Sequence, residues 1–299
     1  MPELPEVETI ARGLAKRVTD DVIESVWLGQ KKEPLKSPAN AIASALENSR
    51  IISIRRIGKH IVFDLERNSA APTSRKMRAK RPAASKRGER SDSGTPSQSS
   101  NAQWIVHLGM TGRLQVCDPH SEIEKHTHAI LKLSSGRELR FVDPRRFGRL
   151  SVVTTGNFDA VGIEPLEADL EPFTKLFHGR KTPIKSALLN QKLLRGVGNI
   201  YADESLFRAG IRPRRRAATI NRQQFGKLHS AVKEVLKEAI ALGGSSISDY
   251  VDADGAEGFF QLQHRVYGRE GEPCLVCKAP IKRIVIAGRS SHFCPKCQH

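Results

Sequence analysis

The sequence contains no long hydrophobic run: none of its stretches approaches the roughly 18 apolar residues that a membrane-spanning helix requires. Its first twenty residues also lack the basic and then apolar pattern of an export signal, and carry Glu3, Glu6 and Glu8 instead. Both absences argue against a membrane protein or an exported one. We expect a folded cytoplasmic protein whose 299 residues suffice for about two domains, each with its own core.

Cysteine is scarce, with five residues in the chain, and an odd number does not suit a disulfide framework. Four of them form two Cys-x2-Cys pairs at a spacing typical of structural zinc sites, namely Cys274, Cys277, Cys294 and Cys297. Redox-active dithiols are the alternative, but Ile281, Arg283 and Val285 alternate between the pairs as in a β-hairpin. We therefore predict one structural zinc ion in a basic two-stranded finger. The fifth cysteine, Cys117, is expected to be a small buried hydrophobe.

Negative charge is in deficit, because Lys and Arg outnumber Asp and Glu by 49 to 32 and the formal net charge is +17. This balance favours a polyanionic partner, either nucleic acid or an anionic membrane surface, and charge alone does not choose between them. Residues 67–100 hold nine basic and two acidic residues, hence +7 of the total. Because this segment is rich in Ser, Pro and Ala and has no apolar periodicity, we predict that it is a disordered insertion.

Hydrophobic periodicity divides the rest of the chain into a sheet-rich half and a helical half. A helix is expected over residues 4–18, where apolar residues share one face and Pro5 suits the first turn. Alternating and β-branched residues predict a sandwich or barrel with strands over 50–57, 60–66, 104–108, 128–133, 138–142 and 149–153. From about residue 175 the pattern predicts a helical bundle, with helices over 183–194, 199–208 and 223–242. A linker is expected over 156–172, and a cleft between the halves would suit a duplex.

One short segment has the features of a phosphate site. Gly196 and Gly198 lie between two predicted helices, with Asn199 at an N-cap position. Exposed backbone amides there, assisted by the helix dipole, can bind a phosphate. The ordinary alternative is a tight connection between two helices.

Two further segments have side chains suited to a disrupted duplex. Residues 143–148 place Arg145 and Phe147 on a turn, where an Arg can pair with an orphaned base and a Phe can wedge between bases. Met110, on the glycine-flanked segment 107–112, has the unbranched side chain to fill the void left by an extruded nucleotide. The alternatives are a turn with a buried Phe and a core Met.

The N-terminal run Pro2-Glu3-Leu4-Pro5-Glu6 resembles that of the formamidopyrimidine-DNA glycosylase family, in which the segments above recur in the same order. The resemblance covers nearly the whole chain apart from the insertion. It implies an α+β multidomain protein with an N-terminal β-sandwich, a helix-two-turn-helix bundle and a β-hairpin zinc finger. The implied boundaries are a catalytic domain over 1–155, a linker over 156–172, the helical domain over 173–268 and the finger over 269–299.

The same resemblance implies base-excision repair: removal of 8-oxoguanine and formamidopyrimidines, then strand cleavage by β- and δ-elimination. It makes Pro2 the nucleophile and Glu3 the acid at the sugar, and it assigns the two eliminations to Lys59 and Arg289. The implied DNA contacts are His126, Arg145, Arg180, Lys185, Asn199, Met110 and Phe147, and the implied lesion contacts are Glu6, Ser246, Ser248 and Tyr250. His128 is left to packing. The implied partner is double-stranded DNA with oxidised purines or abasic sites, bound by a monomer associated with the nucleoid of a bacterial cytoplasm.

Elementary chemistry supports the roles of Pro2 and Glu3. A free N-terminal amine titrates near 7.7 to 8, so part of it is neutral at physiological pH, and nearby cations enlarge that part. The adduct of a secondary amine opens to an iminium without a further proton, which gives an electron sink for elimination. Glu3 can protonate the ribose ring oxygen only if its carboxyl is neutral, and this requires desolvation or a neighbouring carboxylate such as Glu6. The alternative is that Glu3 simply caps the helix.

Two departures from the family pattern concern the insertion and the loop that closes over the extruded base. Relatives have a short turn in place of 67–100, and we expect the basic insertion to tether DNA independently of its sequence. In the loop, Ser248 stands where relatives often have Lys or Arg, while amides of residues 246–250 remain to read an oxidised purine. Presence of the loop, and Leu4 in place of a Gly, favours a purine-directed enzyme over the endonuclease VIII type. The alternative class is a zinc-containing DNA-binding protein without catalysis, which intact Pro2, Glu3, Lys59 and Arg289 argue against.

Overall fold

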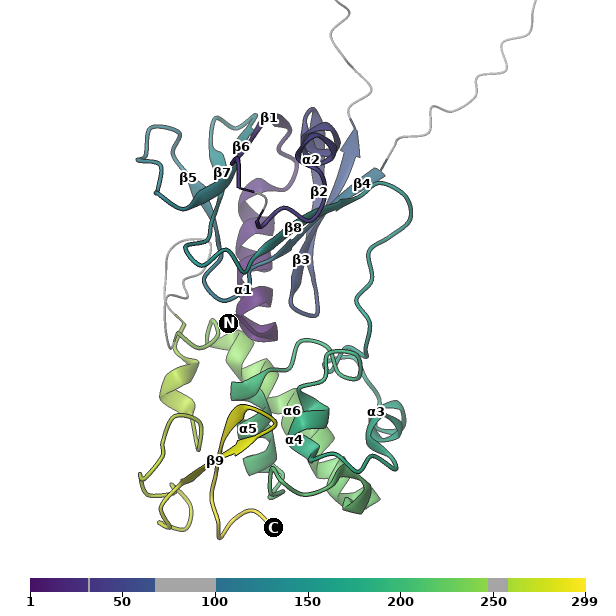
Figure 1. The fold of residues 1–299 in the computed structure, drawn as a ribbon, viewed down its shortest axis with the longest axis vertical. Helices are drawn as coiled ribbons and strands as arrows, with labels where there is room; N and C mark the ends of the chain where they lie inside the picture. Colours follow the sequence, from purple (N-terminus) through teal and green to yellow (C-terminus); the bar gives the residue numbers. More distant parts are fainter. Residues whose placement is uncertain (32, 68–100, 247–257) are drawn as a thin grey trace, which may run out of the picture.

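The computed structural model of the chain describes residues 1–31, 33–67, 101–246 and 258–299. Figure 1 shows two bodies along the long axis, with the sheets at one end and most helices and the C-terminal hairpin at the other. Helix α1 (Leu4–Val18) runs from the junction of the bodies into the sheets. None of the helices in the described ranges has both the length and the apolar character needed to cross a membrane.

Helix α1 forms where the sequence predicts it. Pro5 lies in its first turn, where the missing N–H is not needed, and Lys16 and Arg17 lie in the last turn, where they complement the helix dipole. Its apolar face is buried against the sheets through Val7, Ile10 and Leu14, among others. The start of the helix is thereby fixed, and with it the first three residues of the chain.

The N-terminal body is a sandwich of two antiparallel four-stranded sheets, which confirms the first of the two expected architectures. One sheet has the order β1-β6-β7-β5, formed by Ile23–Leu28, Thr127–Leu133, Glu138–Val142 and Arg113–Cys117. The other has the order β2-β3-β4-β8, formed by Ser49–Ile57, His60–Arg67, Asn101–His107 and Arg149–Val153. Both sheets, α1 and α2 (Ala39–Leu46) share one hydrophobic core.

The second body contains four α-helices in the described ranges around its own core. They are α3 (Leu170–Phe177), α4 (Ile184–Leu188), α5 (Asn199–Arg208) and α6 (Arg222–Ala241), with short 3-10 helices at Ala217–Thr219 and Phe260–Gln263. Leu4, from the start of α1, is buried in this core rather than in the sandwich core. The two bodies therefore meet at the N-terminus of the chain.

The C-terminal finger is a hairpin of β9 (Lys282–Ile286) and β10 (Arg289–Phe293), as the alternation predicts. Two buried carboxylates of α5 hold it. Asp203 accepts hydrogen bonds from Ser291 Oγ (2.9 Å) and His292 N (2.8 Å). Glu204 accepts from the backbone N–H groups of residues 265, 266 and 267 at 2.8–3.0 Å. Helix α5 thus positions the finger against the rest of the molecule.

Several sequence-based expectations need correction. The helix expected over 183–194 ends at Leu188, because a turn closed by the Gln191 side chain follows. The N-cap of α5 is Gly198 and not Asn199: a Cβ at position 198 would lie 2.2 Å from the Glu3 carboxyl carbon. Cys117 is half-buried at the end of β5 and not in the core. The expected insertion falls outside the described residues from 68 to 100, and β3 and β4 pair up to Glu66 and Asn101 on either side of it.

Candidate active site

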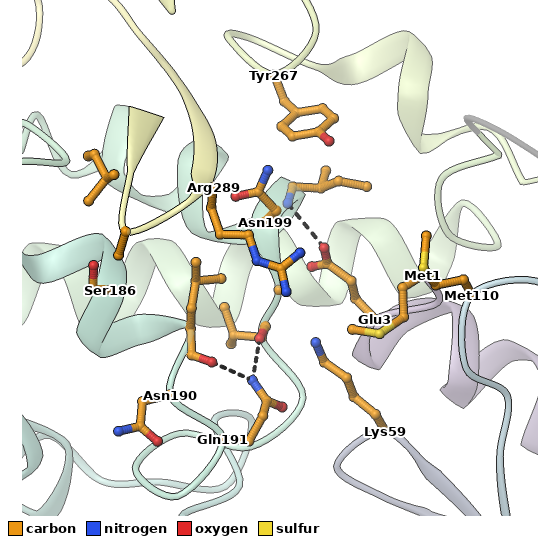
Figure 2. Close-up of a pocket in the computed structure, with 16 residues that line it drawn as sticks. Met1, Glu3, Lys59, Met110, Ser186, Asn190, Gln191, Asn199, Tyr267 and Arg289 are labelled. Atoms are coloured by element: carbon orange, nitrogen blue, oxygen red, sulfur yellow. Dashed lines mark hydrogen bonds between the residues drawn. The ribbon is translucent and has the colours of Figure 1, made fainter. Parts of the chain in front are cut away.

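A cavity of about 530 Å³ lies where the sandwich, the helical body and the finger meet (Figure 2). Five predicted site residues line it, namely Glu3, Lys59, Met110, Asn199 and Arg289. Met1 lines it as well, directly before Pro2, which is half-buried. Residues far apart in the sequence are thus brought to one space, and the chain start forms part of its wall.

Glu3 is the N-cap residue of α1 and is buried, with 4% of its surface exposed. Its backbone N–H donates to Glu6 Oε2 (2.8 Å), which closes the capping box of the helix. Its own carboxylate accepts from the backbone N–H of Ile200 (3.1 Å), as the dashed line in Figure 2 shows. Burial raises the pKa of Glu3 to about 7, although Lys59 opposes the shift. Near neutral pH this carboxyl group therefore exists in both protonation states, as an acid catalyst requires.

Cationic groups of three segments face Glu3. Lys59 lies in the turn between β2 and β3 and is 7% exposed; its burial lowers the pKa of the ammonium group. Arg289 begins β10 beyond the hairpin turn and extends over Asn199 toward Glu3 (Figure 2). Burial also lowers the pKa of the Met1 amine, and Lys59 and Arg145 lower it further, while Glu3 and Glu6 oppose this. The cavity thus favours a neutral amine at the chain start and a neutral carboxyl beside it.

Buried polar atoms without a hydrogen-bond partner gather near this cavity. Among the described residues they include Glu3 Oε2, Asn199 Oδ1 and Ser186 Oγ, all on residues that line it. A buried polar atom costs free energy when it has no partner, so native proteins seldom leave one without a function or a ligand. These atoms indicate a site that is completed by a polar ligand.

The other predicted phosphate contacts differ in accessibility. His126 is exposed just before β6, whereas His128 is buried and its Nε2 lies 3.0 Å from the carbonyl oxygen of Asp143. Arg180 is exposed and does not line the cavity. Lys185 is buried: its ammonium group lies 2.7 Å from Asp203 and donates to the carbonyl oxygen of Ser290 (2.5 Å). In this arrangement Lys185 holds the hairpin that presents Arg289.

Met110 and Phe147 are both exposed, by 40% and 52% respectively. The guanidinium carbon of Arg145, also exposed, lies 5.0 Å from the centroid of the Phe147 ring, at cation–π distance. The alternatives of a core Met and a buried Phe are therefore wrong. Exposed large side chains on two adjacent loops are instead available to a partner.

Two of the four predicted lesion contacts, Glu6 and Ser246, are among the described residues. Glu6 is buried, and its carboxylate accepts from the Tyr201 hydroxyl and from Ser245 N (2.8 Å). Ser246 is half-buried, its N–H donates to the Gln261 side chain, and its hydroxyl accepts from Gly258 N. The remaining two, Ser248 and Tyr250, lie outside the described residues. Glu6 connects the chain start to the helical body.

The four finger cysteines meet as the spacing predicts. Their Sγ atoms all lie within 4.8 Å of one another, with 3.4 Å between Cys277 and Cys294 and 3.9 Å between Cys274 and Cys297. Tetrahedral zinc with bonds of about 2.3 Å would place its sulfur ligands about 3.8 Å apart. The donor set and its dimensions fit one structural zinc ion with no open coordination position.

Sequence reasoning missed several residues of the cavity wall, among them Tyr267 and Gln191. Tyr267, one of three tyrosines in the chain, stands just before the finger, and its ring faces the cavity near Asn199 (Figure 2). Gln191 donates to the carbonyl oxygens of Leu189 and Val197 and accepts from Gly196 N. The scarcity of tyrosine is a signal for the first, but nothing in the sequence pattern distinguishes the second from a surface glutamine.

Comparison with known proteins gives one result along the whole chain. The family model "Formamidopyrimidine-DNA glycosylase N-terminal domain" matches residues 1–150, the H2TH domain model of the same enzymes matches 161–251, and "Zinc finger found in FPG and IleRS" matches 271–299. The formamidopyrimidine-DNA glycosylase of Solibacter usitatus is 42% identical over 304 residues, covering 100% of this chain and 99% of its own. That of Gluconobacter oxydans is 40% identical and covers 100% of both chains.

Solved structures agree. The MutM (Fpg) protein of Thermus thermophilus superimposes with a TM-score of 0.79 at 37% identity, over 99% of this chain and 98% of its own. The Lactococcus lactis Fpg bound to DNA with an abasic site has a TM-score of 0.81 at 30% identity, over 99% of each chain. On the matched domains, the four-cysteine finger and the cavity at the chain start, this protein belongs to the formamidopyrimidine-DNA glycosylase family.

Proposed function

We propose that this protein excises oxidised purines from double-stranded DNA in base-excision repair and then cleaves the strand at the abasic site. Family membership supports the glycosylase activity, and Lactococcus lactis relatives have been solved with DNA containing Fapy-dG or an abasic site. The single observation that carries the proposal is the buried carboxyl of Glu3, whose pKa of about 7 makes it an acid beside the chain start. A module that only binds DNA has no need of such a group.

The nucleophile in this proposal is the secondary amine of Pro2, exposed once Met1 has been removed. The surroundings that lower the pKa of the Met1 amine are the surroundings that the Pro2 amine would enter, which favours its unprotonated form. Its lone pair attacks the sugar C1′, and the base leaves with the electrons of the glycosidic bond. After ring opening the nitrogen and C1′ form an iminium, which accepts the electrons released by elimination.

Glu3 acts as the acid at the sugar. It donates its proton to the ribose ring oxygen as the bond from C1′ to that oxygen breaks. The carboxyl can do so because burial keeps a large protonated fraction near pH 7. Its Oε2, which has no partner among the described residues, is the oxygen available to the sugar.

Lys59 and Arg289 serve the two eliminations. Both line the cavity with Glu3 from segments outside α1, and the lowered pKa of Lys59 makes its ammonium group a readier proton donor than an exposed lysine. β-Elimination removes a proton from C2′ and expels the 3′ phosphate. δ-Elimination then removes a proton from C4′ and expels the 5′ phosphate, so the strand is cut twice. The guanidinium of Arg289 stabilises the phosphate charge.

DNA binding is assigned to the segments around the cavity. Asn199 receives a backbone phosphate, with His126 and Arg180 as further contacts. The amides predicted to assist it are occupied, because Ile200 N donates to Glu3 and Gly196 N donates to Gln191. Met110, Arg145 and Phe147 replace the extruded nucleotide, and Lys185 acts through the hairpin it holds. Lesion recognition is assigned to Glu6, Ser246, Ser248 and Tyr250. The four cysteines would hold zinc, which stabilises the finger and takes no part in the reaction.

We assign the domain boundaries to about residues 155, 172 and 268, with DNA in the cleft between the first and the second domain. Helix α3 begins at Leu170, within the assigned linker. The protein acts as a monomer in a bacterial cytoplasm, associated with the nucleoid through its DNA binding. A reducing compartment keeps the four finger thiols available to zinc.

Borohydride trapping tests the proposal. Protein shown by mass spectrometry to lack Met1 should form a covalent complex with an 8-oxoguanine duplex, linked through Pro2. Glu3→Gln should lower single-turnover excision by about 10²- to 10⁴-fold, the usual contribution of an acid catalyst, with duplex affinity retained. Pro2→Gly is the matched variant, since it leaves a primary amine at the same position. Binding without trapping or excision would favour a non-catalytic zinc-containing DNA-binding protein.

A further inference from the structure

Asp143 lies beneath the two exposed loops that present Met110, Arg145 and Phe147. One loop joins β4 to β5 and the other joins β7 to β8, so each of them passes from one sheet of the sandwich to the other. Asp143 itself is fully buried. In the description above it has no part in binding or chemistry.

The Asp143 carboxylate bonds to both loops: Oδ1 reaches across to the Met110 loop, and Oδ2 bonds within its own turn. Oδ1 accepts from the Thr111 hydroxyl (2.6 Å), which belongs to the Met110 loop, and from Arg145 N (3.3 Å). Oδ2 accepts from Gly148 N (2.7 Å), directly after Phe147. Hydrogen bonds to a charged acceptor are about twice as strong as neutral ones, so this carboxylate is a firm link between the loops.

Backbone contacts bring the same loops together. A Cβ at Gly109 would lie 2.5 Å from the carbonyl carbon of Phe147. The backbones of the two loops are therefore in contact at a place that has no room for a side chain. Arg146 has a φ of 58°, in the left-handed region that is costly for a residue with a side chain. A conformation of this kind persists only where surrounding contacts fix it. The bonds from Arg145 N and Gly148 N to Asp143, on either side of Arg146, are such contacts.

We infer that Asp143 is a positioning residue that joins the Met110 loop and the 144–147 turn into one rigid unit, so that their side chains enter the duplex together. The inference rests on the proposed function and adds a residue that touches neither DNA nor the reacting atoms. Two independent loops would each have to be ordered on insertion, and that entropic cost would slow extrusion of the base. A linked pair has this order before DNA arrives.

Thr111 provides the cleanest test, because Thr111→Val removes only the hydroxyl that crosses between the loops. Thr111→Ser keeps the hydroxyl and is the matched control. Loss of a hydrogen bond to a buried charged group should slow single-turnover excision of 8-oxoguanine by about tenfold or more. Cleavage at a preformed abasic site, where no base is extruded, should change by less than about twofold. On a Met110→Ala background the effect of Thr111→Val should shrink, because both act through one unit.

Amide hydrogen exchange of the free protein tests the link without DNA. Thr111→Val should speed exchange at Arg145 and Gly148, and Thr111→Ser should not. Asp143→Asn, whose amide nitrogen cannot accept from Gly148 N, should give the larger change in the same direction. Unchanged exchange in both variants would overturn the inference, as would equal losses on both DNA substrates or an undiminished effect on the Met110→Ala background. Absence of borohydride trapping in the wild type, with normal exchange differences, would contradict the proposed function and leave the link intact.

Discussion

Two pairs of a buried lysine and a buried carboxylate in the described part of the chain differ in their surroundings. Lys185 and Asp203 are in contact at 2.7 Å, and each has further bonds to the hairpin. Lys59 and Glu3 share a cavity wall, yet no ion pair joins them within the described ranges, and Glu3 Oε2 has no partner there. The charges of the first pair are satisfied by contacts within the protein, whereas the second pair has an oxygen atom available to a ligand.

The difference shows how burial can serve either structure or chemistry. A buried charge is expensive unless hydrogen bonds and an opposite charge surround it, and Lys185 has both. Burial lowers the pKa of both lysines, but at Lys185 the Asp203 carboxylate opposes the shift through a hydrogen bond as well as its charge, whereas at Lys59 only the charges of Glu3 and Glu6 oppose it. Burial also raises the pKa of Glu3 to about 7. A group with its pKa near neutrality can exchange a proton during a reaction, whereas a satisfied ion pair cannot do so without breaking.

The largest expected effect on stability comes from breaking the ion pair between Lys185 and Asp203. Asp203→Asn removes the charge that compensates Lys185 and should lower the free energy of unfolding by about 3–5 kcal/mol, as for other broken buried pairs. Lys59→Met is the comparison variant: it removes a buried cation without a close partner, so unfolding should change little while strand cleavage falls. Urea denaturation of both variants measures this. Equal destabilisation by the two variants would contradict the distinction between a structural pair and a catalytic pair.

A smaller effect should appear in the pH dependence of stability. The folded pKa of Glu3 lies above its ordinary value of 4.5, so between pH 4.5 and about 7 the folded state binds more protons than the unfolded state. The stability contributed by the protonated form is complete below pH 4.5 and is lost as pH rises through 7. Relative to Glu3→Gln, the wild type should therefore lose about 1.4 kcal/mol for each pKa unit of the shift. Parallel stability curves for the two proteins between pH 4.5 and 8 would mean that this carboxyl is not perturbed.

The smallest expected effect concerns the positive charge of residues 68–100, which belongs to neither of the two pairs. Residues 68–100 contain eight basic and two acidic residues, and we expect them to add non-specific DNA affinity. Because β3 and β4 pair up to Glu66 and Asn101, replacing the segment by Asn-Gly leaves a three-residue loop with Arg67, which can close the hairpin without disturbing the sheet. The variant should show a shallower dependence of DNA affinity on salt, with single-turnover excision within about twofold. A salt slope equal to that of the full chain would refute the tether.

The sequence alone predicted the parts of the fold that have clear periodicity. Helix α1, the sandwich and the hairpin with its four cysteines follow from patterns that each element carries within itself. It did not predict α2, α3, β1 or β5. Of these, α2 and β5 are short, and β1 is exposed at three of its six positions, without strict alternation. Such segments are stabilised by tertiary contacts that no local pattern records.

The sequence named five residues that line the cavity, but it did not show what their side chains contact there. The sequence identified Lys185 as a DNA contact, whereas its burial against Asp203 depends on the meeting of α4, α5 and the hairpin. Likewise, the requirement for a neutral Glu3 could be stated in advance. The cause, burial against residues 198–200 nearly two hundred positions away, could not. Long-range proximity of this kind comes only from the folded chain.

The position of the two chain ends bears on how the protein can be produced and labelled. Met1 lines the cavity, so a tag attached before it would occupy the space needed by substrate. At the other end, His299 exchanges backbone hydrogen bonds with Gly210 and Arg212, so this residue is docked against the helical body. The connection between β3 and β4 tolerates a long segment in this chain, and it leaves the sheet at the end opposite Lys59. An affinity handle or fluorophore is best placed there.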